Sequence, residues 1–265
     1  MSSLLKFFSL TYAVTWACFF GAAAVSGVAG PSGLRQPLLL LGTFAPALVA
    51  LWLTARAGGS AGALALLRRL FAWRVGARWY VFAAGYMAAV KLAVAFVHRA
   101  TTGAWPRFGQ EAWIVILVAM AISTPVQAGE EIGWRGYALP GLAARFGFAR
   151  ASILLGLIWA CWHLPLFFIP GVDNYGQSFL VFMLGVTPLS VAMAWLYGHA
   201  HGSLLLVMLM HSAVNQTSGI VPSAVAGATN PLALSASLVA WLTVAVLWVC
   251  AACFLVWMPK TELPA

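Results

Sequence analysis

Charged residues are scarce in this sequence. Asp, Glu, Lys and Arg make up 7% of its 265 residues, five of them acidic, whereas hydrophobic residues make up 63%. The mean hydropathy of +0.95 lies well above that of a water-soluble globular domain. This scarcity excludes a soluble domain and favours an integral membrane protein.

Cysteine is also rare. The four cysteines lie in apolar runs, which indicates neither a disulfide framework nor a paired-CxxC zinc site. The formal charge of +9 comes from fourteen Lys and Arg residues, most of them in short links between apolar runs. That distribution is typical of the positive-inside rule, so nucleic acid is not expected as a partner.

Eight apolar runs approach or exceed the roughly 20 residues of a membrane-spanning helix. They predict an all-α fold, a polytopic membrane helix bundle of about eight transmembrane helices in contact with membrane lipids. We expect a single integral-membrane domain over residues 1–265, with a motif-bearing core at about 112–222. The runs are approximately Leu10–Val28, Pro37–Thr54, Trp79–Val97, Ala112–Tyr137, Ala151–Ile169, Gln177–Tyr197, Leu204–Val221 and Pro231–Trp257.

The link between the second and third runs is rich in arginine and sets the predicted topology. Placing it in the cytoplasm puts both termini in the cytoplasm as well, in a multi-pass protein of the cell membrane. Residues 60–75 carry leucines at helical spacing beside arginines and predict an amphipathic helix on the membrane surface; a basic loop is the alternative. Lys91, near the far end of the third run, is expected to extend its side chain towards the membrane surface.

Two successive acidic residues end the fourth run. Adjacent helical positions point about 100° apart, so Glu130 and Glu131 cannot face the same cavity. Arg135 follows Glu131 by four residues, the spacing of an intrahelical ion pair. Glu130 then lacks a local partner and is the first candidate base, unless the helix end rises into the headgroups and both acids are hydrated. Pro125 predicts a kink just before the pair.

Two further runs carry polar residues at helical spacing. His163 follows Trp159 by four residues, and Asn215 follows His211 by four, so each pair shares a helix face. A rise of 1.5 Å per residue puts Glu130, His163 and His211 all roughly 10 to 20 Å deep. The three spans are therefore predicted to meet at one polar site.

A carboxylate, two imidazoles and a carboxamide suit hydrolysis of an amide bond. Glu130 with His163 would take a proton from water, and His211 with Asn215 would donate hydrogen bonds to the oxyanion. A zinc site formed by Glu130, His163 and His211 would use similar residues, but the spacing is not that of an HExxH motif. The residues fit both mechanisms.

Three ordered motifs resemble those of the CAAX protease and bacteriocin-processing family, also called CPBP or Abi, which includes the type II CAAX prenyl endopeptidases. They are Glu130-Glu131-x-x-x-Arg135, Trp159-x-x-x-His163 and His211-x-x-x-Asn215. The resemblance covers about Pro125–Gln216, and Trp159 stands where the family usually has Phe. It implies a multi-helix intramembrane endopeptidase with a cavity open to the cytosol.

The resemblance also implies the roles of individual residues and the substrate class. The implied site is Glu130, His163, His211 and Asn215, with Glu131, Arg135 and Trp159 in support. Such enzymes have been described both as metalloproteases and as glutamate-dependent; we favour the second, without a cofactor, and keep zinc as the alternative. The expected substrate is a peptide or protein that is lipidated or has a hydrophobic C-terminal tail.

Two other functions would use the same polar residues. A membrane transporter could employ them as a relay, although no internal repeat is visible. A non-catalytic peptide-binding or immunity protein would have no need of a complete water-activating set. We therefore favour the endopeptidase.

Overall fold

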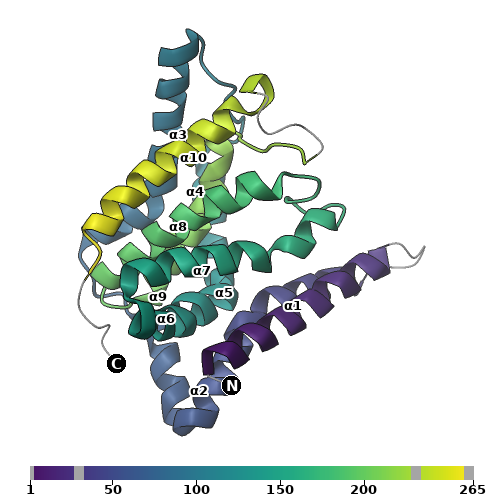
Figure 1. Ribbon diagram of the computed structural model, residues 1–265, viewed down its shortest axis with the longest axis vertical. Helices are drawn as coiled ribbons and strands as arrows, with labels where there is room; N and C mark the ends of the chain where they lie inside the picture. Colours follow the sequence, from purple (N-terminus) through teal and green to yellow (C-terminus); the bar gives the residue numbers. More distant parts are fainter. Residues whose placement is uncertain (1–2, 27–32, 228–233, 260–265) are drawn as a thin grey trace.

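The computed structural model describes residues 3–26, 33–227 and 234–259, which form a bundle of α-helices (Figure 1). Short 3-10 segments extend several helices, at 69–71, 124–127, 164–168 and 218–220, and a π-helical turn covers Trp134–Ala138. The helices are α1 Ser3–Ser26, α2 Arg35–Arg68, α3 Ala77–Thr102, α4 Trp113–Ser123, α5 Ala128–Gly133, α6 Leu139–Phe146, α7 Phe148–Trp162, α8 Phe179–His199, α9 Leu204–Thr217 and α10 Leu234–Val256.

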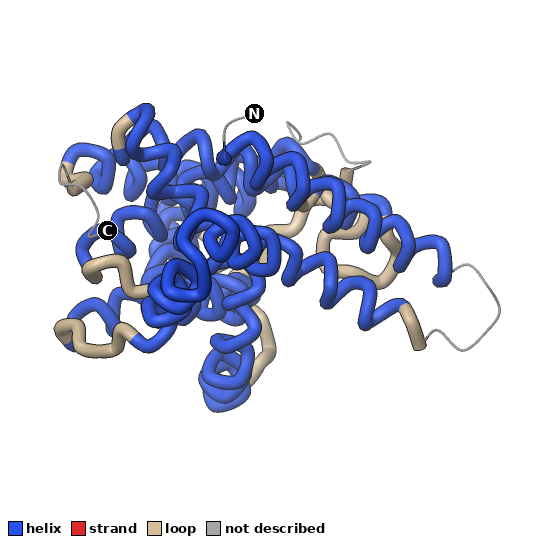
Figure 2. The backbone as a smooth tube through the Cα atoms, turned by 90° about the horizontal axis from the view of Figure 1, so that it is seen from below, coloured by secondary structure: helices blue, strands red, loops and turns tan. Residues whose placement is uncertain are grey.

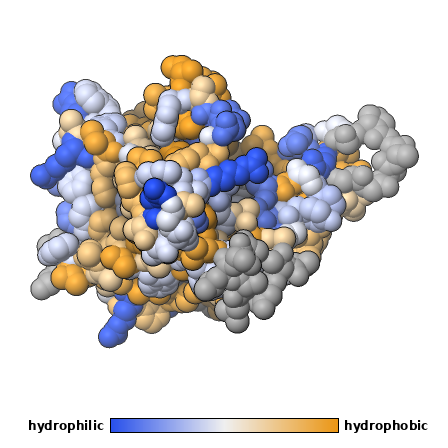
Figure 3. Space-filling view, turned by 90° about the horizontal axis from the view of Figure 1, so that it is seen from above, coloured by the Kyte–Doolittle hydropathy of each residue, from blue (hydrophilic) through white to orange (hydrophobic). Residues whose placement is uncertain are grey.

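Seven helical segments within the described residues are long and apolar enough to cross a membrane. The predicted seventh run corresponds to a shorter apolar helix, Leu204–Ile220. Large apolar side chains such as Ile114, Ile122 and Val249 are exposed, and apolar surface is extensive in Figure 3. The predicted fold class, a polytopic helical membrane bundle, is confirmed.

Helix α9 lies at the centre of the packing. It contacts α3, α4, α5 and α8, while α2 packs against both α1 and α5. Helices α1 and α2 form an antiparallel pair that projects from the rest of the bundle (Figures 1 and 2). Of the helices that carry the predicted motifs, α9 is therefore an interior element, and α5 packs against both α2 and α9.

The bundle has two ends. We call the end where α2 finishes and α3 begins the basic face; there Ser203 Oγ donates to the carbonyl of Ala72 at 2.7 Å. At the other end, the opposite face, the amide of Gly109 after α3 donates to Ile220 after α9 at 3.1 Å, and the amide of Ser178 after α7 donates to Val225 at 2.7 Å. The loops that follow α3, α7 and α9 therefore share the opposite face.

The fourth predicted run is helical but not uniform. It continues from Trp113 to Phe146, beyond the expected end at Tyr137, and is interrupted by the 3-10 turn Thr124–Gln127 and the π-helical turn. The 3-10 turn contains Pro125, where a kink was predicted. Both interruptions flank α5, so the acidic pair lies on a short helix between two irregular turns.

Two glycines let α5 approach α2 closely. A Cβ atom on Gly129 would lie 2.8 Å from the ring of Phe44, and one on Gly133 would lie 2.6 Å from the backbone carbonyl carbon of Pro46. Small residues four apart on a helix allow such close backbone packing in membrane proteins. This contact fixes where the side chains of α5 point.

The position of Lys91 in the sequence predicted that its side chain would extend towards the membrane surface. This prediction is wrong. Its side chain is fully buried, and Nζ donates to Ser223 Oγ at 2.7 Å. The chain bends back over α3 after α9, which covers Lys91 with a loop that hydropathy alone did not reveal.

The predicted helix over residues 60–75 is confirmed only for 60–68, which extend α2 beyond a break at Gly58 and Gly59. Residues 69–71 form a 3-10 turn and residues 72–75 are not helical. Gly59 has a φ of 63°, a left-handed value that favours glycine. Leu66 is buried in the bundle. The membrane-surface position of residues 60–75 stays a prediction.

Candidate active site

All four predicted catalytic side chains line one cavity of about 850 Å³. Glu130 comes from α5, His163 from the C-terminal end of α7, and His211 and Asn215 from α9. Trp159, one turn before His163, lines it too. The structure therefore brings the three motifs together around a single cavity.

Glu131 and Arg135 form the ion pair that their spacing predicts. Arg135 Nη1 lies 2.9 Å from Glu131 Oε1 and 3.0 Å from Oε2, and both side chains are fully buried. Arg135 Nη2 donates to the sulfur of Met193 at 3.3 Å. The pair stands behind the cavity rather than in it, because neither residue lines the cavity.

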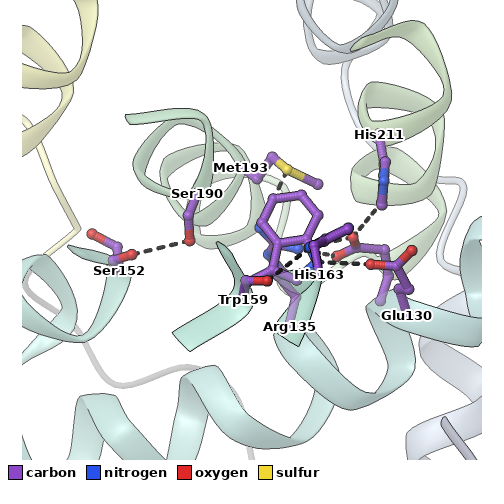
Figure 4. A network of polar contacts seen from close by, with 9 residues as sticks. Glu130, Arg135, Ser152, Trp159, His163, Ser190, Met193 and His211 are labelled. Atoms are coloured by element: carbon purple, nitrogen blue, oxygen red, sulfur yellow. Dashed lines mark hydrogen bonds and ion pairs between the residues drawn. The ribbon is translucent and has the colours of Figure 1, made fainter. Parts of the chain in front are cut away.

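Glu130 has a partner on another helix. Trp159 Nε1 donates to Glu130 Oε2 at 2.7 Å (Figure 4), and Glu130 is 7% exposed. Sequence reasoning treated Trp159 only as an aromatic residue and missed its N–H. Because a phenylalanine has no such donor, this contact distinguishes the chain from the usual family pattern.

Trp159 also connects the other polar groups of the site. Its ring centroid lies 5.5 Å from that of His163 and 5.3 Å from that of His211. The guanidinium carbon of Arg135 lies 4.3 Å from the ring centroid, within range of a cation–π interaction. One indole therefore contacts the acid, the buried cation and both histidines.

Hydrogen bonds orient the two imidazoles in the same way. His163 Nδ1 lies 2.8 Å from the carbonyl oxygen of Trp159, and a carbonyl can only accept, so the proton is on Nδ1. His211 Nδ1 lies 2.7 Å from Glu131 Oε1, and the same reasoning applies. In the neutral form each histidine therefore has an unprotonated Nε2.

Asn215 follows His211 by one turn and is exposed. Within the described part of the chain its side chain makes no hydrogen bond. Its carboxamide N–H groups are thus available to a bound molecule.

The alternative zinc site is not assembled. No three His, Cys, Asp or Glu side chains among the described residues are close enough to hold one metal ion. The alternative set of Glu130, His163 and His211 shares the cavity, and the hydrogen bonds of these residues leave Glu130 Oε1 and both Nε2 atoms without a partner in the part of the chain that the structure describes. In the arrangement described, however, the three side chains do not form a group that could hold a metal ion.

The cavity extends from the site to the opposite face. Its lining includes residues 172–174 and 177–178 after α7 and residues 218–219 and 222–225 after α9, and these loops lie at the opposite face. The prediction placed both the arginine-rich loop and the opening in the cytoplasm. The cavity lining reaches the end of the bundle away from that loop, and the cytoplasmic position of the opening stays a prediction.

Comparisons with known proteins cover the same part of the chain. Residues 110–217 match the family model described as type II CAAX prenyl endopeptidase, Rce1-like. The chain is also 25% identical over 224 residues to CAAX prenyl protease 2 of Methanococcus maripaludis, a match that spans 79% of this chain and 81% of that protein.

The matched segment contains all three motifs, from Glu130 to Asn215. The apolar helices and the family match together indicate a multi-pass membrane protein that is similar to known proteases. The resemblance seen in the motifs is thereby confirmed: residues 110–217 of this chain are similar to the Rce1-like type II CAAX prenyl endopeptidases.

Proposed function

We propose that the protein is a glutamate-dependent intramembrane endopeptidase. The observation that carries the proposal is that Glu130, two histidines with available Nε2 atoms and the Asn215 carboxamide line one cavity. These groups supply a base, proton carriers and hydrogen-bond donors, the functions that amide hydrolysis requires.

In the proposed mechanism, Glu130 and His163 take a proton from a water molecule, which attacks the carbonyl carbon of the scissile bond. Asn215 and His211 donate to the oxyanion that forms. For His211 this requires a proton on Nε2 as well as Nδ1, and the Glu131 carboxylate, which accepts from Nδ1, stabilises the imidazolium. Collapse of the intermediate breaks the C–N bond, and the proton passes to the leaving amine.

The proposed substrate is a peptide or protein with a lipidated or hydrophobic C-terminal tail. Much of the cavity wall is apolar, with Leu39, Leu166, Val214, Val244 and Leu247 among the lining residues. The name of the Methanococcus relative, CAAX prenyl protease 2, refers to prenyl groups. A prenylated peptide is therefore the first substrate to test, beside the same peptide without the lipid.

We propose no cofactor for the reaction, so a chelator should leave the rate of cleavage unchanged. The measurement is turnover after incubation with EDTA or 1,10-phenanthroline, with a zinc protease as the positive control. Loss of turnover that stoichiometric zinc restores would assign the reaction to the metal mechanism instead.

The decisive experiment is peptide cleavage by purified protein carrying Glu130→Gln or His163→Ala. Each change should lower kcat by at least about a hundredfold, in the range of removing a general base. Glu111→Gln is the matched control, because Glu111 is exposed in a loop and should have no effect. Undiminished turnover of the Glu130 variant would refute the proposal.

The same purified proteins also distinguish the endopeptidase from the two other functions, transport and peptide sequestration. A transporter would move solute across proteoliposomes without cleaving the peptide. A sequestering protein would bind the peptide and release it intact.

A further inference from the structure

A buried lysine stands behind the wall of the candidate active site, bonded to a residue that lines it. Lys91 lies on α3, one turn after the cavity-lining Met87, and its side chain is fully buried. An ammonium group inside a membrane bundle is costly unless it is paired, and such residues usually serve a function.

Lys91 has no carboxylate partner among the described residues. The chain has five acidic residues, and the ion pairs in the described ranges all involve Glu131, with Arg135 and His211. Glu130 accepts from Trp159, and the hydrogen bond that Lys91 makes is to Ser223. The positive charge is thus left for an anion from outside these residues.

Ser223 connects Lys91 to the cavity. Its hydroxyl accepts from Lys91 Nζ at 2.7 Å, and the residue lines the cavity that holds Glu130 and His211. Because the oxygen accepts from Lys91, the hydroxyl proton is free to be donated elsewhere. The ammonium behind it is weakly screened in this interior, which favours an anionic acceptor.

We propose that Ser223, supported by Lys91, binds the free C-terminal carboxylate of the peptide substrate. This inference rests on the proposed endopeptidase function and extends it, since it makes the cavity a site for chain ends. Apolar walls next to Ser223, formed by Val225, Ala240 and Val244, would accept the apolar side chains that precede the carboxylate. Both residues lie outside the segment matched by the family model.

The test is binding, so that it does not depend on cleavage. The protein is full-length Glu130→Gln, and the probe is a fluorescent peptide with a farnesylated cysteine followed by three apolar residues, made as a free acid and as a C-terminal amide. The free acid should bind about tenfold or more tightly, as expected for a hydrogen bond to a charged group. Ser223→Ala and Lys91→Met should each remove the difference and leave binding of the amide unchanged.

Equal binding of acid and amide would overturn the inference, as would a preference that survives Ser223→Ala. Ser218→Ala is the matched control, since Ser218 lines the same cavity and should keep the preference. If Lys91→Met fails to fold, Ser223→Ala alone decides. An amide peptide that carries an internal aspartate and binds as tightly as the acid would reassign the site to side-chain carboxylates.

Cleavage by the wild-type protein tests the proposed function separately. If the wild-type protein cleaves the peptide but the free acid and the amide bind equally well, only the carboxylate site is contradicted. Preferential binding without cleavage contradicts only the endopeptidase.

Discussion

At the scale of single residues, Trp159 has the largest consequences. Its N–H group holds one oxygen of Glu130, and its ring contacts both histidines and Arg135. A ring at this position packs the site whether it is indole or phenyl, but indole alone also supplies a hydrogen bond to the carboxylate. We infer that in this chain Trp159 also orients Glu130, the proposed base.

Trp159→Phe should separate packing from hydrogen bonding. The phenyl ring keeps the apolar contacts, while the loss of a hydrogen bond to a charged group is worth roughly 1.5 to 3 kcal/mol, or about a ten- to hundredfold fall in kcat. KM should change little, and the melting temperature should fall modestly, because a buried side chain loses volume as well as a hydrogen bond. Trp105→Phe, at an exposed tryptophan, is the control for loss of an indole; an unchanged kcat for Trp159→Phe would contradict the role.

At the scale of elements, the fourth span shows how α5 is held in place. The 3-10 turn before it and the π-helical turn after it change the rotation of the helix, and π-helical turns are frequent at functional sites. Gly129 and Gly133 then fix its distance from α2. The direction of the acidic side chains therefore depends on residues that take no part in the chemistry.

Gly133→Ala should disturb the site without altering any polar group. The new Cβ would lie 2.6 Å from a backbone atom of Pro46, so α5 must move away from α2, at a cost of typically 1 to 3 kcal/mol for overpacking. We expect a lower melting temperature and reduced cleavage. Gly85→Ala is the matched control, because a Cβ there meets nothing within 4 Å; equal stability of the two variants would refute this account.

At the scale of the whole molecule, the two ends of the bundle differ in character. The basic face holds the arginine-rich link of residues 69–76, and the cavity extends to the opposite face. The positive-inside rule assigns the arginine-rich link to the cytoplasm. We therefore propose that the cavity opens away from the cytoplasm; the cytoplasmic location of both termini stays a prediction.

Labelling of intact cells tests the orientation. In a variant without native cysteines, Asp173→Cys, in the loop after α7, should react with a membrane-impermeant maleimide. Arg74→Cys should react only after the cells are opened. Both positions are exposed in the structure, so accessibility within the protein does not differ. The reverse pattern would place the cavity opening in the cytoplasm.

The sequence alone determined the class of protein, the approximate spans and the membership of the polar cluster. Hydropathy identifies helices because the bilayer requires long apolar segments with internally satisfied backbones. Spacing identifies Glu131 with Arg135, and His211 with Asn215, because residues four apart share a helix face. These are local properties, and they need no knowledge of which helices touch.

Only the tertiary structure decided which side-chain contacts form between different helices and loops. The bond from Trp159 to Glu130, the anchoring of His211 by Glu131 and the burial of Lys91 under Ser223 join residues 29, 80 and 132 positions apart. The face to which the cavity extends is also a product of packing, since it depends on where the loops after α7 and α9 meet. Periodicity constrains the direction of a side chain around its own helix, whereas its partner depends on how the helices are arranged in space.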